Sequence, residues 1–288
     1  MRKTAAFYDM DGTLIEGNVS DHYIYFAFQD PDLANRAKRI LELAVKAPYF
    51  WALDRIDRHT FNEVFYRCYE GLSEDRLIVL GEEMFEKVLK QKLYPAARAL
   101  VDADRALGRE LVLLTGAVEA VARPVARHLG IETFVATKLE FAQNSLATGR
   151  ILPPIMAGPE KSQFVRRYAE KHDIDLENSV AYADDAADLP LLSCVGRPVA
   201  VNPDLRLATT ARSHRWNVIH LAPEPSLATS VQRGARNAAD AARSFFERAR
   251  AEGEARWEER DQVMDRAKRA LGMLGKMVRG ARPGETPK

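Results

Sequence analysis

The sequence predicts an α/β fold in which a doubly wound parallel sheet carries a helical insert after its first strand. Three observations predict this fold. The apolar run Ala5–Tyr8 lacks the alternation of a half-exposed strand, which is typical of a strand buried on both faces. Residues 21–92 show helical spacing almost throughout. From Tyr94 onward, helices alternate with short apolar strands, as expected for a parallel sheet.

The first strand runs directly into the hexapeptide Asp9–Leu14, which holds two carboxylates one residue apart. Gly12 lets the chain turn, so Asp9 and Asp11 can approach a common point differently, one by its side chain and one partly by its backbone. Two carboxylates about 4 Å apart repel by roughly 4 kcal/mol at an effective dielectric of about 20, and a bound cation or a shared proton relieves this repulsion. The pattern indicates phosphoryl-transfer chemistry; the alternative is an Asp-rich turn that caps a helix.

The second predicted element is the helical segment 17–92, called the cap below. Its apolar residues recur at helical spacing in three groups: Tyr23, Phe26 and Ala27; Ile40, Leu41 and Ala44; Phe61, Val64, Phe65 and Tyr69. Pro31, Pro48 and Gly71 are expected to separate the helices. A cap that follows the two aspartates directly can exclude water and select the substrate.

The remaining strands are expected at Leu111–Leu114, Phe134–Ala136, Val180–Ala183 and Val199–Val201. The first of these runs ends in Thr115-Gly116, whose hydroxyl and backbone N–H groups can hold phosphate oxygens. The alternative is a dipeptide that merely ends a strand.

Two later segments carry charged candidates. Lys161 lies at the start of a predicted helix and can neutralise phosphate charge, although a solvated lysine is common at such positions. Asp184 follows the run Val180–Ala183, and the spacing to Asp188 puts both on one side of the next turn. Acidic helix N-caps are the alternative explanation for these two aspartates.

Taken together and in this order, these segments resemble the haloacid dehalogenase superfamily, and more closely its subfamily IB, which contains phosphoserine phosphatase. The resemblance covers residues 4–221 approximately, and the motif that starts at Asp9 is its most specific part. It implies a Rossmann-like core of residues 1–16 and 93–221 and a cap of residues 17–92. Residues 130–159 are expected to form a strand and a hairpin, which is too short for the larger cap of other branches.

The resemblance implies an enzyme that hydrolyses a small phosphorylated metabolite. Asp9 is the expected nucleophile, which forms an aspartyl phosphate. Asp11 would protonate the leaving oxygen and then activate water. Thr115 and Gly116 would bind phosphoryl oxygens, and Lys161 would offset their charge.

The resemblance also implies a Mg²⁺ ion. Its expected ligands are the Asp9 carboxylate, the Asp11 carbonyl and Asp184, with water and phosphate completing the coordination. Asp188 is expected to orient Lys161 or a metal-bound water.

Departures from the family pattern bear on the substrate. The Glu with which phosphoserine phosphatases meet the substrate amine is replaced by Asn18, and Glu16 lies two residues early. The cap Arg that would bind the substrate carboxylate falls near Arg67 and Cys68. Phosphoserine is therefore not the favoured substrate.

Other residues near the motifs leave open questions. Asp185 replaces the small residue usual after the first Asp of the last motif, and the sequence does not decide whether it is exposed or adds charge near the metal. Asp21, His22 and Arg67 are hypothesised to contact substrate, although helix surfaces often carry such groups without a catalytic role.

Composition limits the other function classes. With 288 residues, 47% of them hydrophobic, the chain can bury a sizeable core of one or two domains. A net charge of +1 gives no reason to expect a nucleic-acid partner. Cys68 and Cys194 have no Cys or His at metal-ligand spacing, so we expect packing residues rather than a zinc site. The few apolar residues before Asp9 are too short for a signal peptide, so a cytoplasmic location is expected.

Two further functions remain open from the sequence. One is phosphoryl transfer to an acceptor other than water, as in phosphomutases. The other is a catalytically silent scaffold that binds a membrane or a partner, against which the complete set of motif residues argues.

Residues 222–288 are predicted to form a helical extension with a disordered end. Between Arg266 and Arg282 there are six basic residues and no acidic one. One hypothesis is weak association of this segment with anionic membrane, peripheral to the bilayer. The alternative is a solvated helix that docks on the core or on a partner, and the oligomeric state is left open.

Overall fold

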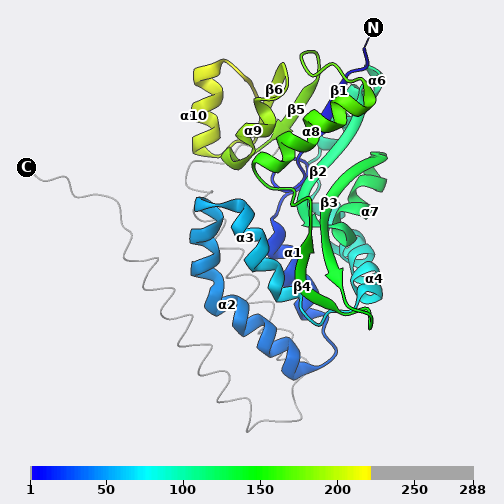
Figure 1. Ribbon diagram of the computed structural model, residues 1–288, viewed down its shortest axis with the longest axis vertical. Coiled ribbons are helices and arrows are strands. Elements are labelled where there is room, and N and C mark those ends of the chain that lie inside the picture. Colours follow the sequence, from blue (N-terminus) through cyan, green and yellow to red (C-terminus); the bar gives the residue numbers. More distant parts are fainter. Residues whose placement is uncertain (1, 222–288) are drawn as a thin grey trace, which may run out of the picture. The chain divides into compact units, whose positions relative to one another are not determined.

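The computed structural model describes residues 2–221 (Figure 1). All of these except 41–45 belong to one compact unit, and both the sheet and the cap residues that concern the site lie within it. The predicted extension 222–288, with its membrane hypothesis, lies outside the described residues. Within the described part, no helix is both long enough and apolar enough to cross a membrane.

One sheet organises the described residues, with the strand order β4-β3-β2-β1-β5-β6-β7. Neighbouring strands are parallel except for the antiparallel pair β3 and β4. The strands are β1 (Ala5–Tyr8), β2 (Glu110–Val118), β3 (Thr133–Phe141), β4 (Ala147–Leu152), β5 (Val180–Ala183), β6 (Arg197–Val201) and β7 (Asn217–Ile219). The predicted α/β class and the hairpin within residues 130–159 are confirmed.

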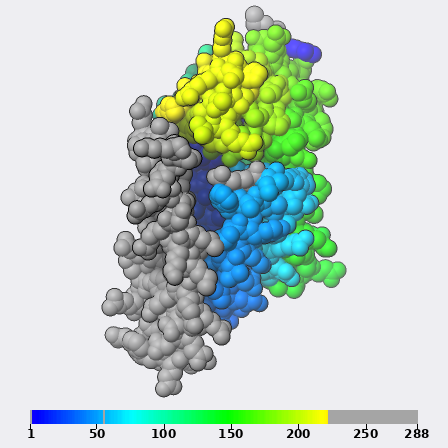
Figure 2. All heavy atoms as spheres, turned by 90° about the vertical axis from the view of Figure 1, so that its left-hand side faces the viewer, coloured from blue at the N-terminus to red at the C-terminus, as the bar shows by residue number. Residues whose placement is uncertain are grey.

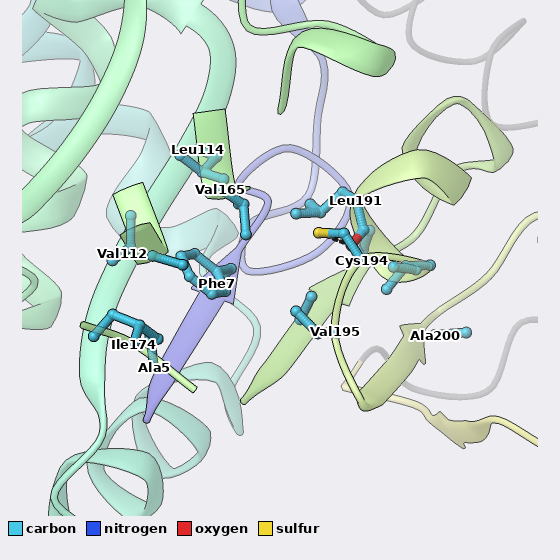
Figure 3. Close-up of a cluster of buried hydrophobic side chains, with 14 of the residues drawn as sticks. Ala5, Phe7, Val112, Leu114, Val165, Ile174, Leu191, Cys194, Val195 and Ala200 are labelled. Carbon is cyan, nitrogen blue, oxygen red and sulfur yellow. Dashed lines mark hydrogen bonds between the residues drawn. The ribbon is translucent and has the colours of Figure 1, made fainter. Parts of the chain in front are cut away.

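The central strand β1 is buried on both faces, as its apolar run predicts. All four of its residues are fully buried. Ala5 and Phe7 belong to the hydrophobic cluster drawn in Figure 3. On the other face, the Tyr8 hydroxyl donates a hydrogen bond to Asp104. Because β1 has sheet neighbours on both sides, the residues that follow it are held in a fixed position.

Helices cover both faces of the sheet. The cluster around Phe7 includes residues of α8 (Pro159–His172), α9 (Leu189–Leu192) and α10 (Leu205–His214), so these helices pack on one face. The helix α6 (Ala97–Ala106) lies on the other face, where it carries Asp104. The helix α7 (Glu119–Leu129) contacts β2 and β3.

The helical insert between β1 and α6 is present. It consists of α1 (Val19–Phe28), α2 (Leu33–Ile56), α3 (Arg58–Phe65), a 3₁₀ helix η1 (Tyr66–Tyr69), α4 (Glu74–Met84), a π-helix η2 (Phe85–Leu89) and α5 (Lys90–Lys92). Figure 1 draws these elements in blue to cyan. The expected break at Pro48 is wrong, because Pro48 lies inside α2. A proline removes only one helical hydrogen bond, and this helix continues on both sides of it.

An aromatic cluster holds α1, α2, α3 and η1 together. Its rings contact one another edge to face, tilted or stacked, at centroid distances from 5.1 to 6.4 Å. The members are Tyr23, Phe26, Phe50, Phe61, Phe65, Tyr66 and Tyr69, and each is at most 5% exposed. Since these side chains pack on one another, they fix the face of the cap on which His22 and Tyr66 lie.

The chain leaves and re-enters the sheet region along two adjacent segments. Ile15 forms an antiparallel bridge with Leu93. The Glu16 N–H donates to the Lys92 carbonyl at 2.8 Å, and the Tyr94 N–H donates to the Leu14 carbonyl at 3.0 Å. These bonds join the start of the cap to its end, directly after the hexapeptide.

Candidate active site

The register of the sheet brings the candidate segments to one edge. Tyr8 lies opposite Leu113 of β2 and opposite Tyr182 of β5. Because these strands are parallel, Asp9, Thr115 and Asp184 all follow within two residues of that level. Three motifs that are far apart in the sequence therefore meet at one end of adjacent strands, where sites of such sheets lie.

The loop after β1 is tightly closed. The Gly12 N–H donates to the Ile15 carbonyl at 2.8 Å, and the Leu14 N–H donates to the Met10 carbonyl at 2.9 Å. Gly12 has a φ of +83°, and a Cβ at this position would lie 2.0 Å from Oδ2 of Asp184. Only glycine adopts this positive φ without strain and also has no Cβ to collide with Asp184. Gly12 therefore lets the first motif approach Asp184 closely.

Lys161 is the electrostatic centre of the site. Its Nζ lies 2.6 Å from Oδ1 of Asp9 and 2.8 Å from Oδ2 of Asp188. The solvated-lysine explanation is wrong, because Lys161 is only 4% exposed. Burial alone would lower its pKa, but the Asp188 and Asp9 charges outweigh burial and raise the pKa above the ordinary value. Lys161 therefore stays charged between two buried carboxylates.

Thr13 joins the first and last motifs. Its hydroxyl oxygen lies 3.0 Å from Oδ1 of Asp184 and 3.3 Å from Oδ2 of Asp9. It is fully buried, and its single hydrogen can be donated to either carboxylate. Sequence reasoning assigned no role to Thr13, although its place in the hexapeptide was the available signal.

Both carboxylates beside Thr13 are electrostatically strained. Burial raises the pKa of Asp9 to about 6; Lys161 opposes this shift, and Asp188 adds to it. Burial, followed by the charge of Asp9, raises the pKa of Asp184 well above its ordinary value. A cation between them would relieve this cost.

The donor set fits Mg²⁺. No group of three or more His, Cys, Asp or Glu side chains within residues 2–221 is arranged to hold a metal ion. Mg²⁺ needs no such group, since it commonly binds one or two carboxylates and keeps several waters. Asp9 and Asp184 supply two carboxylates as oxygen ligands, and both lie within hydrogen-bond distance of the Thr13 hydroxyl. The Asp11 carbonyl is the expected third protein ligand.

Thr115 and Gly116 lie within β2 rather than after it. The strand continues to Val118, with a shift of its register to β3 between Leu114 and Val118. The expected strand end at Leu114 is therefore wrong by four residues, because the strand continues past the apolar run with an irregular pairing to β3. The buried Thr115 hydroxyl accepts a hydrogen bond from the Ala117 N–H at 3.0 Å, which leaves its own hydrogen for a phosphate oxygen.

The Gly116 carbonyl links the sheet to the cap. It accepts hydrogen bonds from the Thr137 hydroxyl at 2.7 Å and from the Tyr66 hydroxyl. A Cβ at Gly116 would lie 3.4 Å from the side-chain nitrogen of Asn62. Tyr66 and Asn62 border the candidate phosphate site, and sequence reasoning did not find them.

Of the three cap residues hypothesised to contact substrate, His22 reaches a motif residue. Its Nε2 lies 3.2 Å from Oδ1 of Asp11. Asp21 instead forms the capping box of α1 with Asn18. Arg67 is exposed.

Asp185 connects the sheet to the cap. Its Oδ2 lies 3.1 Å from Nη2 of Arg58 at the start of α3, and Nη1 of Arg58 lies 3.0 Å from Oδ1 of Asp54. Asp185 also caps the 3₁₀ helix η3 (Ala186–Asp188) by accepting from the Ala187 N–H at 2.7 Å. The open question about Asp185 thus has a structural answer: it pairs with a cation from the cap.

The site is closely covered, with Asp9 only 6% exposed. Figure 2 shows atoms of the N-terminal part of the chain, in dark blue, within a recess between the lighter blue cap helices and the yellow end of the core. A separate cavity of about 740 Å³ lies between α9, β6 and α10, and none of the candidate site residues lines it. The candidate active site and this cavity are therefore separate.

Comparisons with known proteins show the family and the fold of this chain. A family model for haloacid dehalogenase-like hydrolases matches residues 6–193. Phosphoserine phosphatase SerB1 of Mycobacterium tuberculosis is 29% identical over 221 residues, covering 74% of this chain and 70% of that protein. A crystal structure of a protein of unknown function from Bordetella pertussis Tohama I has a TM-score of 0.66 at 26% identity, covering 77% of this chain and 100% of that one. A substrate-bound phosphoserine phosphatase shares the fold, with a TM-score of 0.56 at 16% identity over 76% of this chain and 93% of that one.

Proposed function

Because the chain belongs to the haloacid dehalogenase-like hydrolases, we propose that it is a magnesium-dependent phosphatase that hydrolyses a small phosphate monoester through Asp9. The observation that carries this proposal is the buried Lys161 ammonium, held between Asp9 and Asp188. A nucleophile that must approach a phosphate dianion needs such a fixed cation. The name of the similar mycobacterial protein, a phosphoserine phosphatase, supports the same reaction class.

The proposed reaction has two steps. A carboxylate oxygen of Asp9 attacks phosphorus, while the leaving alcohol departs with a proton from Asp11. A water molecule then attacks the phosphorus of the aspartyl phosphate and gives a proton to Asp11, which frees Asp9 and inorganic phosphate. Lys161 reduces the repulsion between phosphate and Asp9, and the Thr115 hydroxyl donates to a phosphoryl oxygen.

Asp9, Asp184 and the Asp11 carbonyl are the groups that would hold Mg²⁺. When bound, the ion supplies positive charge beside the phosphoryl oxygens and orients the phosphate. The Thr13 hydroxyl, within hydrogen-bond distance of both Asp9 and Asp184, holds these two carboxylates near each other. The ion pair with Asp188 keeps Lys161 in place.

The substrate we propose is a phosphate ester other than phosphoserine. Asn18, which replaces the expected amine-binding Glu, accepts hydrogen bonds from the N–H groups of Ser20 and Asp21 at 2.9 and 3.2 Å. An N-cap side chain with both of these bonds is committed to the start of α1. The position is therefore used to build the cap rather than to bind a substrate amine.

Phosphate release with and without Mg²⁺ tests this function. The substrates are p-nitrophenyl phosphate and a panel of phosphorylated metabolites, and Asp9→Asn should lower turnover by roughly 10³-fold or more. Asp102→Asn, a matched change on an exposed residue of α6, should leave turnover unchanged. Absence of phosphate release by the wild-type chain on every substrate, in both metal conditions, contradicts the proposal.

A further inference from the structure

His22 occupies an unusual place on the buried face of α1. The buried residues of this helix are Val19, His22, Tyr23, Phe26 and Ala27, which is the spacing of a single apolar stripe. His22 is the polar member of that stripe and is only 1% exposed. A buried imidazole at such a position calls for a specific partner.

Among the side chains that the structure describes, Asp11 is the only acid within ion-pair distance of this imidazole. The distance from Nε2 to Oδ1 of Asp11 is 3.2 Å. Within the same residues, neither ring nitrogen of His22 nor Oδ1 of Asp11 has a well-aligned hydrogen-bond partner. Catalytic hydrogen bonds are often poorly aligned before substrate binds and improve in the enzyme–substrate complex.

We propose that His22 is a positioning residue that holds Asp11 for proton transfer; this inference rests on the proposed function, in which Asp11 is the acid and base. An imidazole that carries its hydrogen on Nε2 donates to Oδ1 of Asp11. Oδ2 of Asp11 then remains to give a proton to the leaving alcohol and to take one from water. His22 itself gains or loses no proton in either step.

This role predicts a dependence on the leaving group. A good leaving group such as p-nitrophenolate departs without protonation, whereas an alkoxide needs the proton of Asp11. Loss of the His22 donor should therefore harm alkyl phosphates far more than p-nitrophenyl phosphate. The quantity to compare is kcat/KM, because it includes only the steps up to departure of the leaving group.

Two polar substitutions separate positioning from packing. In His22→Gln the side-chain amide nitrogen takes the place of Nε2, whereas in His22→Asn it takes the place of Nδ1 and falls short of Asp11. His128→Asn serves as the control, since the His128 ring contacts the Phe85 ring in a tilted arrangement, with centroids 5.1 Å apart, and belongs to none of the candidate site residues. Thermal unfolding of each variant reports whether the fold is kept.

The expected result is a loss specific to His22→Asn. Its kcat/KM should fall by roughly 100-fold for an alkyl phosphate and by less than about 5-fold for p-nitrophenyl phosphate. His22→Gln should recover most of that loss, and the control should match the wild type on both esters.

Other results overturn the inference. Equal losses on the two esters, equal behaviour of the Gln and Asn variants, or a change in KM alone would each contradict positioning of Asp11. Wild-type activity is measured first: a wild-type chain that releases no phosphate overturns the proposed function, whereas an active wild type with unaffected variants overturns only the role of His22.

Discussion

At the residue scale, the site is an arrangement of buried charges that balance only in part. Lys161 offsets part of the charge of Asp9 and Asp188 through contacts of 2.6 and 2.8 Å, whereas within residues 2–221 Asp184 forms no ion pair. Its raised pKa is the consequence, with burial as the main cause. A bound cation, or a proton on Asp184, would relieve this cost.

Removal of the lysine should destabilise the protein. Lys161→Met leaves Asp9 and Asp188 buried without their shared counter-charge, which costs about 3–5 kcal/mol in the free energy of unfolding. Urea unfolding measures this loss, and adding Asp188→Asn should restore part of it. Lys87→Met, at an exposed lysine of η2, should leave stability unchanged, and an equal loss in the two methionine variants would count against the proposed charge balance.

The raised pKa of Asp184 predicts a pH-dependent stability without metal. An acid whose folded pKa exceeds its unfolded value binds more protons when folded, so it lowers stability as pH rises. In a chelating buffer, Asp184→Asn should be more stable than the wild type at pH 8. The difference should shrink as pH falls towards 4, where the wild-type carboxyl is protonated. A difference that grows at low pH would show that Asp184 is stabilised as a carboxylate.

At the element scale, the cap contacts the sheet region through a few polar links. Arg58 of α3 pairs with Asp185 at 3.1 Å, and Tyr66 of η1 donates to the Gly116 carbonyl of β2. Both links lie beside candidate site residues, one next to Asp184 and one next to Thr115. Cap position and site geometry are therefore coupled.

Loss of the Arg58 pair should weaken substrate binding. If the pair holds the cap over the site, Arg58→Ala and Asp185→Ala should each raise KM by up to about 5-fold, which corresponds to about 1 kcal/mol for a partly exposed pair. The double variant should resemble the single ones, because both remove the same contact. Arg127 and Glu82 form another pair between a core helix and a cap helix. Glu82→Ala is the control, and an equal effect there would mean that the Arg58 pair has no special position.

At the scale of the whole molecule, local patterns predicted the sheet and the motif residues. Two apolar runs without alternation, Ala5–Tyr8 and Val180–Ala183, match β1 and β5 residue for residue. Parallel pairing then brings their carboxyl ends together. This pairing explains why Asp9 and Asp184 are neighbours, whereas only the resemblance to the family implied a place for Lys161 beside Asp9.

The parts that sequence reasoning missed depend on long-range packing. β7 is short and largely exposed, so Asn217–Ile219 carries little strand signal. Arg58, Asn62 and Tyr66 acquire neighbours near the site only when the aromatic cluster folds the cap. No local spacing encodes such contacts between separate elements. The domain boundaries at residues 16, 92 and 221 remain predictions.

Metal binding should stabilise the folded protein. Mg²⁺ that binds only the folded state, at a concentration about 100 times its Kd, adds about 2.7 kcal/mol to the free energy of unfolding. Thermal unfolding with Mg²⁺ and with a chelator measures this difference. It should disappear in Asp184→Asn and persist in Asp102→Asn; a gain that survives in Asp184→Asn would place the ion elsewhere.

The central claim is that Asp9 carries the phosphoryl group during turnover. The most direct measurement is mass spectrometry of acid-quenched Asp11→Asn after mixing with p-nitrophenyl phosphate and Mg²⁺, because this variant cannot activate water in the second step. We expect one phosphoryl group per chain, located on the peptide that contains Asp9 and absent from Asp9→Asn. Phosphate release by the wild type together with no phosphorylated chain, or with the group on another residue, would contradict the account.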